Sequence, residues 1–191
     1  MDNIEVLFFW NYFCSLCKML DDTMQFIDHS NSNNIKTNSY EFQKIIMLAS
    51  MEFENISKQL CLLVNNKYKV DDYNIKDITR IVTNNYPEIK SIKIKSDFYE
   101  LTPLSDWRLD LNGWGKEQVY GIDWWKKYNK IKHNAFKNYK EATLKNAMDA
   151  LASLMVLEIV FVKTSTGNNQ IMNDKPCSYF INPYQSDIVC V

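Results

Sequence analysis

One apolar stripe constrains the fold of this chain more than any other feature of its sequence. Large apolar residues recur at alternating spacings of four and three, the heptad pattern of a helix that packs along a neighbouring helix. The stripe consists of Phe42, Ile46, Ala49, Phe53, Ile56, Leu60 and Leu63. Ser39 precedes it by one turn, where its hydroxyl can cap the start of the helix. The stripe therefore predicts a long helix in a bundle of nearly antiparallel helices.

Four further patterns predict the other helices of a mainly α fold. They cover residues 3–27, from 71 until Pro87, 121–134 and 139–162. Glycine and proline number only four each, which disfavours an all-β fold with many tight turns. We therefore expect one domain, 1–191, built as an antiparallel bundle of about five helices.

Residues 87–120 interrupt the helical pattern and predict a long loop insertion. Apolar residues alternate with lysines around Ile92 and Ile94, and this period of two is typical of short strands. We expect a small extended or β insertion near 89–101. Trp107 and Trp114 follow, and we interpret both as packing anchors that fix the rest of the loop on the bundle.

Several polar residues are predicted to face solvent. His29 opens a polar loop at 28–38, and Glu52, Glu54 and Lys58 lie off the heptad stripe. At the other end of the chain, residues 177–191 are expected to form a terminal strand or a segment laid across the surface.

Charge and cysteine content restrict the classes of partner. The net charge is −1, so any attraction to nucleic acid must come from a local basic patch. Five cysteines, an odd number, without a secretion signal indicate a reducing, cytoplasmic location.

The apolar run near the N-terminus is interrupted by Asn11, Ser15 and Lys18 before it reaches a spanning length, so no membrane partner is expected.

The strongest candidate for chemistry is the aromatic and basic stretch 124–134. Asn129 and His133 are four residues apart and share a helix face, and Tyr128 and Lys132 share the adjacent face. Histidine transfers protons near neutral pH, asparagine can orient a sugar or phosphate oxygen, and Lys127 or Lys132 can neutralise a phosphate. These groups suit metal-independent RNA cleavage, in which the 2′-hydroxyl attacks the neighbouring phosphate.

Other interpretations are simpler or have no support. On spacing alone, a solvated or interfacial helix face with a satisfied histidine accounts for the same residues. No phosphate-binding or dinucleotide-binding glycine motif occurs, and only two histidines exist, so no cofactor and no metal site is predicted. Cys14 and Cys17 lie inside an apolar run, which favours buried helical cysteines over half a zinc site.

A resemblance to the HEPN-like superfamily of prokaryotic proteins lies in three segments: Tyr-Asn-Lys-Ile-Lys-His at 128–133, Ala-Thr-Leu-x-Asn-Ala at 142–147, and the apolar helix 150–157. Members are α-helical bundles, and many are RNases of toxin–antitoxin, abortive-infection and other antiviral systems. Their site is an arginine, usually followed by a polar residue, with a histidine four to six residues after the arginine. The resemblance implies His133 and Asn129 as site residues, whereas the arginine position falls on Tyr128 or Lys127.

Three functions follow from that resemblance. In the first, Lys127 or Lys132 replaces the arginine, and the protein is an endoribonuclease. In the second, the site binds RNA or a nucleotide without cutting it. Alternatively, the fold serves as a non-catalytic protein-interaction module, an adaptor or regulatory subunit. The resemblance also implies a homodimer, because the motif helices of the family commonly meet across one, and a cognate protein partner or antitoxin.

Overall fold

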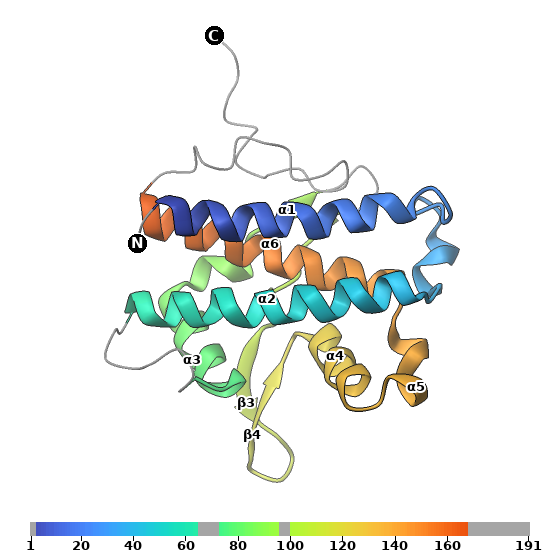
Figure 1. The fold of residues 1–191 in the computed structure, drawn as a ribbon. Helices are drawn as coiled ribbons and strands as arrows, with labels where there is room; N and C mark the ends of the chain where they lie inside the picture. Colours follow the sequence, from blue (N-terminus) through green and yellow to red (C-terminus); the bar gives the residue numbers. More distant parts are fainter. Residues whose placement is uncertain (1–2, 65–72, 96–99, 168–191) are drawn as a thin grey trace.

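The computed structural model describes residues 3–64, 73–95 and 100–167 of the chain (Figure 1). Six α-helices and two small antiparallel sheets occur within these residues. The fold is therefore mainly α with a small β insertion, as the sequence predicts.

Three long helices lie side by side and form the bundle: α1 (Asn3–Thr23), α2 (Tyr40–Val64) and α6 (Leu144–Thr166) (Figure 1). A β-bridge between Asn38 and Thr143 joins the residues just before α2 and α6. These two helices therefore start at the same end of the bundle, while α1 runs in the opposite direction.

The heptad stripe packs α2 against the other helices of the bundle, as predicted. Six of its seven residues have no exposed surface, and the last, Leu63, is 38% exposed near the end of the helix. The hydroxyl of Ser39 accepts a hydrogen bond of 3.0 Å from the backbone N–H of Phe42, which confirms the predicted cap.

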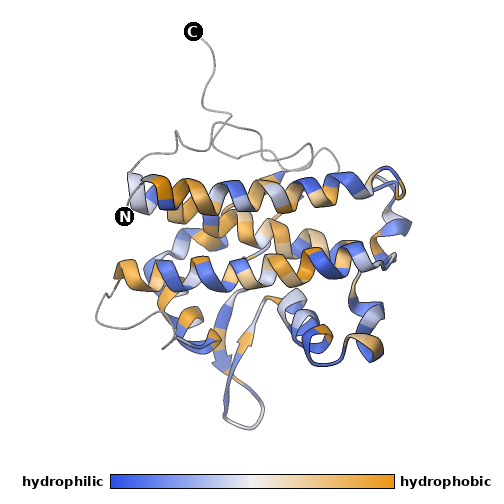
Figure 2. Cartoon of the chain, viewed as in Figure 1, coloured by the Kyte–Doolittle hydropathy of each residue, from blue (hydrophilic) through white to orange (hydrophobic). Residues whose placement is uncertain are grey.

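Helix α6 is the centre of the core. Its side chains are buried on every side from Ala150 to Val162, and the helix itself is accordingly rich in apolar residues (Figure 2). It begins at Leu144 instead of near residue 139, because Thr143 caps it by accepting a hydrogen bond from the Asn146 N–H at 3.2 Å. The residues before it form α5 (Ala135–Asn138) and a short 3₁₀ helix, η4 (Tyr139–Glu141).

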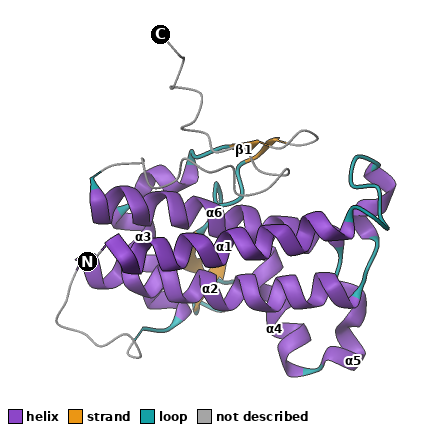
Figure 3. Ribbon diagram, turned by 45° about the horizontal axis from the view of Figure 1, so that its top comes forward, coloured by secondary structure: helices purple, strands orange, loops and turns teal. Residues whose placement is uncertain are grey.

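The insertion contains more regular structure than the sequence predicts. Its elements are η3 (Pro87–Lys90), β1 (Ile94–Lys95), β2 (Glu100–Leu101), β3 (Arg108–Leu111) and β4 (Glu117–Tyr120). Before the insertion, α3 (Ile75–Asn85) confirms the helix predicted to end before Pro87. The β1–β2 pair confirms the extended segment expected near 89–101 (Figure 3). The β3–β4 hairpin replaces what the sequence predicted as a loop.

The two tryptophans of the insertion have different environments. Trp107 is fully buried, and its indole Nε1–H donates to the Thr79 hydroxyl at 3.1 Å. Trp114 is 89% exposed in the turn of the β3–β4 hairpin, so its predicted role as a packing anchor is wrong. After the hairpin, Gly121 takes a φ of +83°, and a Cβ there would lie 2.1 Å from the Asp106 carbonyl carbon. Glycine is thus required where the chain turns into α4 (Asp123–His133).

Two polar residues that were expected in solvent are buried. His29 has no exposed surface, and its Nε2 lies 2.9 Å from the Thr23 hydroxyl, because the loop folds back against the end of α1. Glu52 is only 5% exposed. Helix α2 packs against both α1 and α6, so its buried face is wider than a single heptad stripe.

The remaining expectations concern cysteines and chain segments. Cys17 is buried and Cys14 half-buried in α1, in agreement with helical cysteines packed in the bundle. Among the residues described, no helix combines the length and apolar character needed to cross a membrane. The predicted start of the third helix near residue 71 and the tail 177–191 lie outside the described residues.

Candidate functional site

Helix α4 has a buried aromatic face and an exposed basic face. Trp124, Trp125, Tyr128 and Ile131 are at most 8% exposed. Their spacing of three and four residues places them on one side of the helix. On the opposite side, Lys126, Lys130 and His133 are all exposed and follow the same spacing.

Phe53 of α2 anchors the aromatic face of α4. Its ring centroid lies 5.0 Å from that of Trp124 in an edge-to-face arrangement and 5.8 Å from that of Trp125. Trp125 is in turn 5.1 Å from Tyr128. These contacts hold α4 on the bundle and direct its lysines outward.

The predicted pair, Asn129 and His133, lies on α4 as expected. The two side chains differ in how freely they can contact a ligand. The side-chain amide of Asn129 donates to the carbonyl of Trp125 at 3.0 Å, so one donor is used within the helix. His133 is exposed as the last residue of α4.

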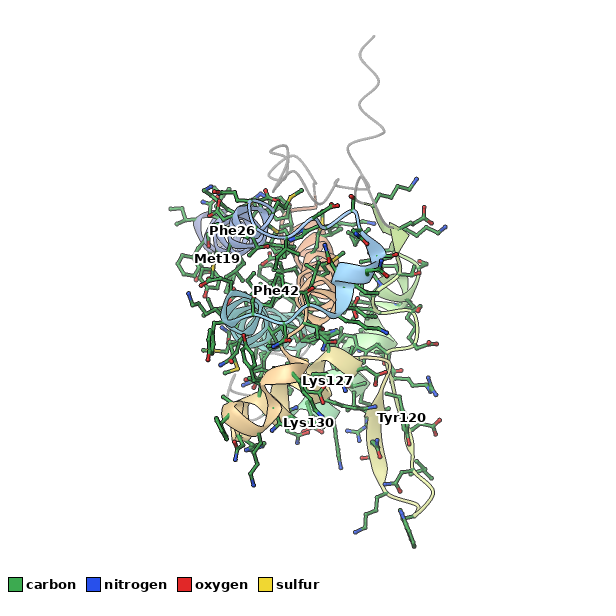
Figure 4. All side chains as sticks on the ribbon, turned by 90° about the vertical axis from the view of Figure 1, so that its right-hand side faces the viewer. Met19, Phe26, Phe42, Tyr120, Lys127 and Lys130 are labelled. Carbon is green, nitrogen blue, oxygen red and sulfur yellow. The ribbon has the colours of Figure 1, made fainter. Side chains whose placement is uncertain are left out.

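A carboxylate holds Lys127, one of the predicted phosphate contacts. Lys127 Nζ lies 2.8 Å from Glu141 Oε2, and Lys130 Nζ lies 3.5 Å from Oε1 of the same residue. The hydrogen bond from Lys127, followed by the charges of both lysines, lowers the pKa of the Glu141 carboxyl. Figure 4 shows the two lysines together on α4. Sequence reasoning missed Glu141, because the turn through α5 and η4 brings it back to α4.

The other two predicted substrate contacts interact with each other. Lys132 Nζ lies 5.5 Å from the centroid of the Tyr128 ring, within the range of a cation–π interaction. Tyr128 itself is only 3% exposed. A contact between Tyr128 and a substrate stays a prediction. Little of the Tyr128 side chain is open to a substrate.

Both arginines of the chain lie on other elements. Arg80 of α3 makes two hydrogen bonds, of 2.9 and 3.0 Å, to the Glu117 carboxylate of β4. Arg108 of β3 lies 5.2 Å from the centroid of the Tyr120 ring. The two arginines line a cavity of about 460 Å³ between α3 and the β3–β4 hairpin. No arginine is therefore positioned by α4 beside His133.

The chain matches no protein-family model, no curated protein and no solved structure. Its function must be argued from its own side chains.

Three aromatic residues beside α4 were not singled out by sequence reasoning. Tyr40 of α2, Phe136 of α5 and Tyr139 of η4 line one pocket at the end of the bundle. Phe136 and Tyr139 each precede a lysine in the sequence, and this pairing of aromatic and basic residues was the available signal. Exposed lysines and the exposed Phe136 ring thus lie on one continuous stretch of chain, and Tyr40 of α2 adds a second exposed ring from another segment.

Proposed function

We propose that the chain binds RNA through its basic arm, defined as residues 123–141, which comprises α4, α5 and η4. The observation that carries the proposal is the exposed row of Lys126, Lys130 and His133 opposite the buried aromatic face. A rigid row of cations fits the regular spacing of phosphates along a nucleic acid.

Charge in the basic arm differs in sign from charge over the whole chain. Six lysines and two carboxylates lie between residues 123 and 141, whereas the chain has a net charge of −1. Such a local patch attracts a polyanion without bulk positive charge. Lys137 and Lys140 extend the exposed cations from α4 into α5 and η4.

Binding without cleavage is the version of the proposal that the geometry favours. Lys127 and Lys130 share the Glu141 carboxylate at 2.8 and 3.5 Å, and Lys126 pairs with Asp123 at 2.9 Å. An amide N–H of Asn129 is bonded within α4. His133 can transfer a proton, but strand cleavage also needs a fixed positive group to stabilise charge on the phosphate. Arginine provides that group in the HEPN-like proteins that the chain resembles, and lysine is a poorer substitute.

The interaction-module alternative is supported by a different surface. Trp114 and Leu111 of the β3–β4 hairpin are 89% and 62% exposed. Exposed apolar side chains at a protruding turn are typical of protein contacts. A protein partner at the hairpin is compatible with RNA at the basic arm. The homodimer implied by the resemblance remains part of the proposal.

The test compares the wild-type protein with His133→Ala on fluorescent single-stranded RNA. We expect both proteins to bind the RNA in anisotropy titrations and neither to shorten it on a denaturing gel, because His133 is exposed and its loss leaves the lysines in place. Cleavage by the wild type that disappears in His133→Ala would replace this proposal with the endoribonuclease one. Absence of RNA binding by the wild type would refute it.

A further inference from the structure

A small aromatic pocket opens beside the basic arm. It has a volume of about 330 Å³ and is lined by Tyr40, Gln43, Ala135, Phe136 and Tyr139. Among the described residues, no charged side chain lines it. The rings of Tyr40 and Tyr139 lie 4.8 Å apart at an interplanar angle of 40°.

Backbone contacts between sequence-distant segments build this pocket. The N–H of Ser39 donates to the carbonyl of Ala142 at 3.2 Å, and the N–H of Leu144 donates to the carbonyl of Thr37 at 2.9 Å. These bonds fix the start of α2 against the chain that leads into α6. Tyr40 and Tyr139 are thereby held next to each other on a rigid part of the fold.

The rings of the pocket are open to a ligand. Phe136 is 95% exposed and Tyr40 is 70% exposed. Leaving aromatic surface in water forfeits the free energy that its burial would contribute, so a cluster of such rings indicates a contact surface. Gln43, which is half-buried, adds an amide that can both donate and accept hydrogen bonds.

The charges around the pocket select the kind of ligand. Lys137 and Lys140 follow Phe136 and Tyr139 directly in the sequence and are exposed. Lys44, one turn after Tyr40 on α2, is also exposed and lies 2.6 Å from Glu41. An aromatic pocket with a rim of lysines complements a flat, apolar group attached to a chain of negative charges.

We propose that this pocket takes one unpaired nucleobase of a single-stranded RNA. The inference rests on the proposed RNA binding by the basic arm and names the form of RNA that the arm prefers. The base stacks on Phe136 and the tyrosine rings, its edge meets the Gln43 amide, and the lysines contact the flanking phosphates. Bases within a duplex are already stacked on their neighbours and do not enter.

The experiment uses single-stranded RNA that carries 2-aminopurine, whose fluorescence falls when it stacks. Wild type is expected to quench the probe and to bind a duplex of the same sequence more weakly. Phe136→Ala should lose the quenching and bind the single strand about fivefold to 100-fold more weakly, because one base–aromatic stack is lost. Phe136→Trp should retain both signals, and Phe136→Leu should behave like Phe136→Ala.

Two results would overturn the inference and leave RNA binding intact. One is wild-type affinity and quenching in Phe136→Ala. The other is wild-type affinity and quenching in Phe136→Leu. That result would show that position 136 needs only an apolar side chain, as a contact with a protein partner would, and not an aromatic ring. Failure of the wild type to bind any RNA would instead refute the proposed function itself. Because Phe136 is almost fully exposed, its replacement should leave the fold unchanged, and circular dichroism checks this.

Discussion

Phe53→Ala should lower the free energy of unfolding by about 3–5 kcal/mol, the usual cost of removing a fully buried aromatic ring. Phe53 has no exposed surface. Its ring contacts Trp124 and Trp125 of α4, and it lies 5.3 Å from the ring of Trp107 before β3. One side chain therefore joins α2 to the insertion and to α4, and little of the cavity left by its loss can collapse.

Urea unfolding followed by circular dichroism measures this effect. Met51→Ala, two residues earlier on α2, is the matched control because Met51 is 52% exposed. We expect the control to change stability by no more than about 0.5 kcal/mol. A cost below about 1 kcal/mol for Phe53→Ala would contradict the account of how α4 is anchored.

Glu158→Gln should stabilise the protein at neutral pH and flatten the dependence of its stability on pH. Glu158 lies on α6 with no exposed surface, and neither of its carboxylate oxygens has a hydrogen-bond partner among the described residues. Burial, reinforced by the nearby charge of Glu52, raises the pKa of Glu158 well above its usual value of 4.5. A buried ionised carboxylate without partners is costly.

The sign of the effect follows from proton linkage. Below pH 4.5, Glu158 is protonated in both the folded and the unfolded chain, and its contribution to stability is fully present. As the pH rises from there towards the raised pKa, the unfolded chain releases the proton while the folded chain keeps it. Stability then falls by about 1.4 kcal/mol per pH unit. Between the ordinary pKa of 4.5 and pH 7, the loss from this group amounts to at most about 3.5 kcal/mol.

Urea midpoints between pH 4 and pH 8 check this prediction. Wild type and Glu158→Gln should be nearly equal at pH 4 and diverge as the pH rises. Burial also raises the pKa of Glu52, against an opposing hydrogen bond from Asn55, so Glu52→Gln should change the profile in the same direction. Glu41→Gln, which removes an exposed carboxylate of α2, is the matched control for the loss of one surface charge. Parallel profiles for wild type and Glu158→Gln would contradict the prediction.

The sequence predicts the helices of the bundle because the residues that identify each helix lie close together in the chain. A spacing of four and three residues identifies α2, and Ser39 marks its start. The same reasoning fails for Glu52 and His29, whose burial depends on elements that are distant in sequence. The β3–β4 hairpin was missed because its strands are only four residues each and none of their residues is fully buried, so no long run of alternating apolar residues marks them.

The candidate site is only partly predictable for a related reason. Spacing correctly places Asn129 and His133 on one helix, and it places the lysines around them. It does not reveal that Lys127 pairs with Glu141, because that contact requires the turn through α5 and η4. Nor does it reveal the pocket between Tyr40 and Tyr139, because these residues belong to sequence-distant segments that the pairing of Asn38 with Thr143 brings together in the fold.

The salt dependence of RNA affinity tests the central proposal most directly. Anisotropy titrations of single-stranded RNA at several salt concentrations compare wild type with the double variant Lys126→Ala/Lys130→Ala. Lys126 pairs with Asp123 at 2.9 Å and Lys130 with Glu141 at 3.5 Å. The matched control, Lys18→Ala/Lys93→Ala, removes two exposed lysines that pair with carboxylates in the same way, at 3.1 and 2.7 Å. If the basic arm contacts phosphates, the slope of log affinity against log salt should fall by about 0.7 for each arm lysine removed. The control should keep the wild-type slope, and equal slopes for the two double variants would contradict the proposal.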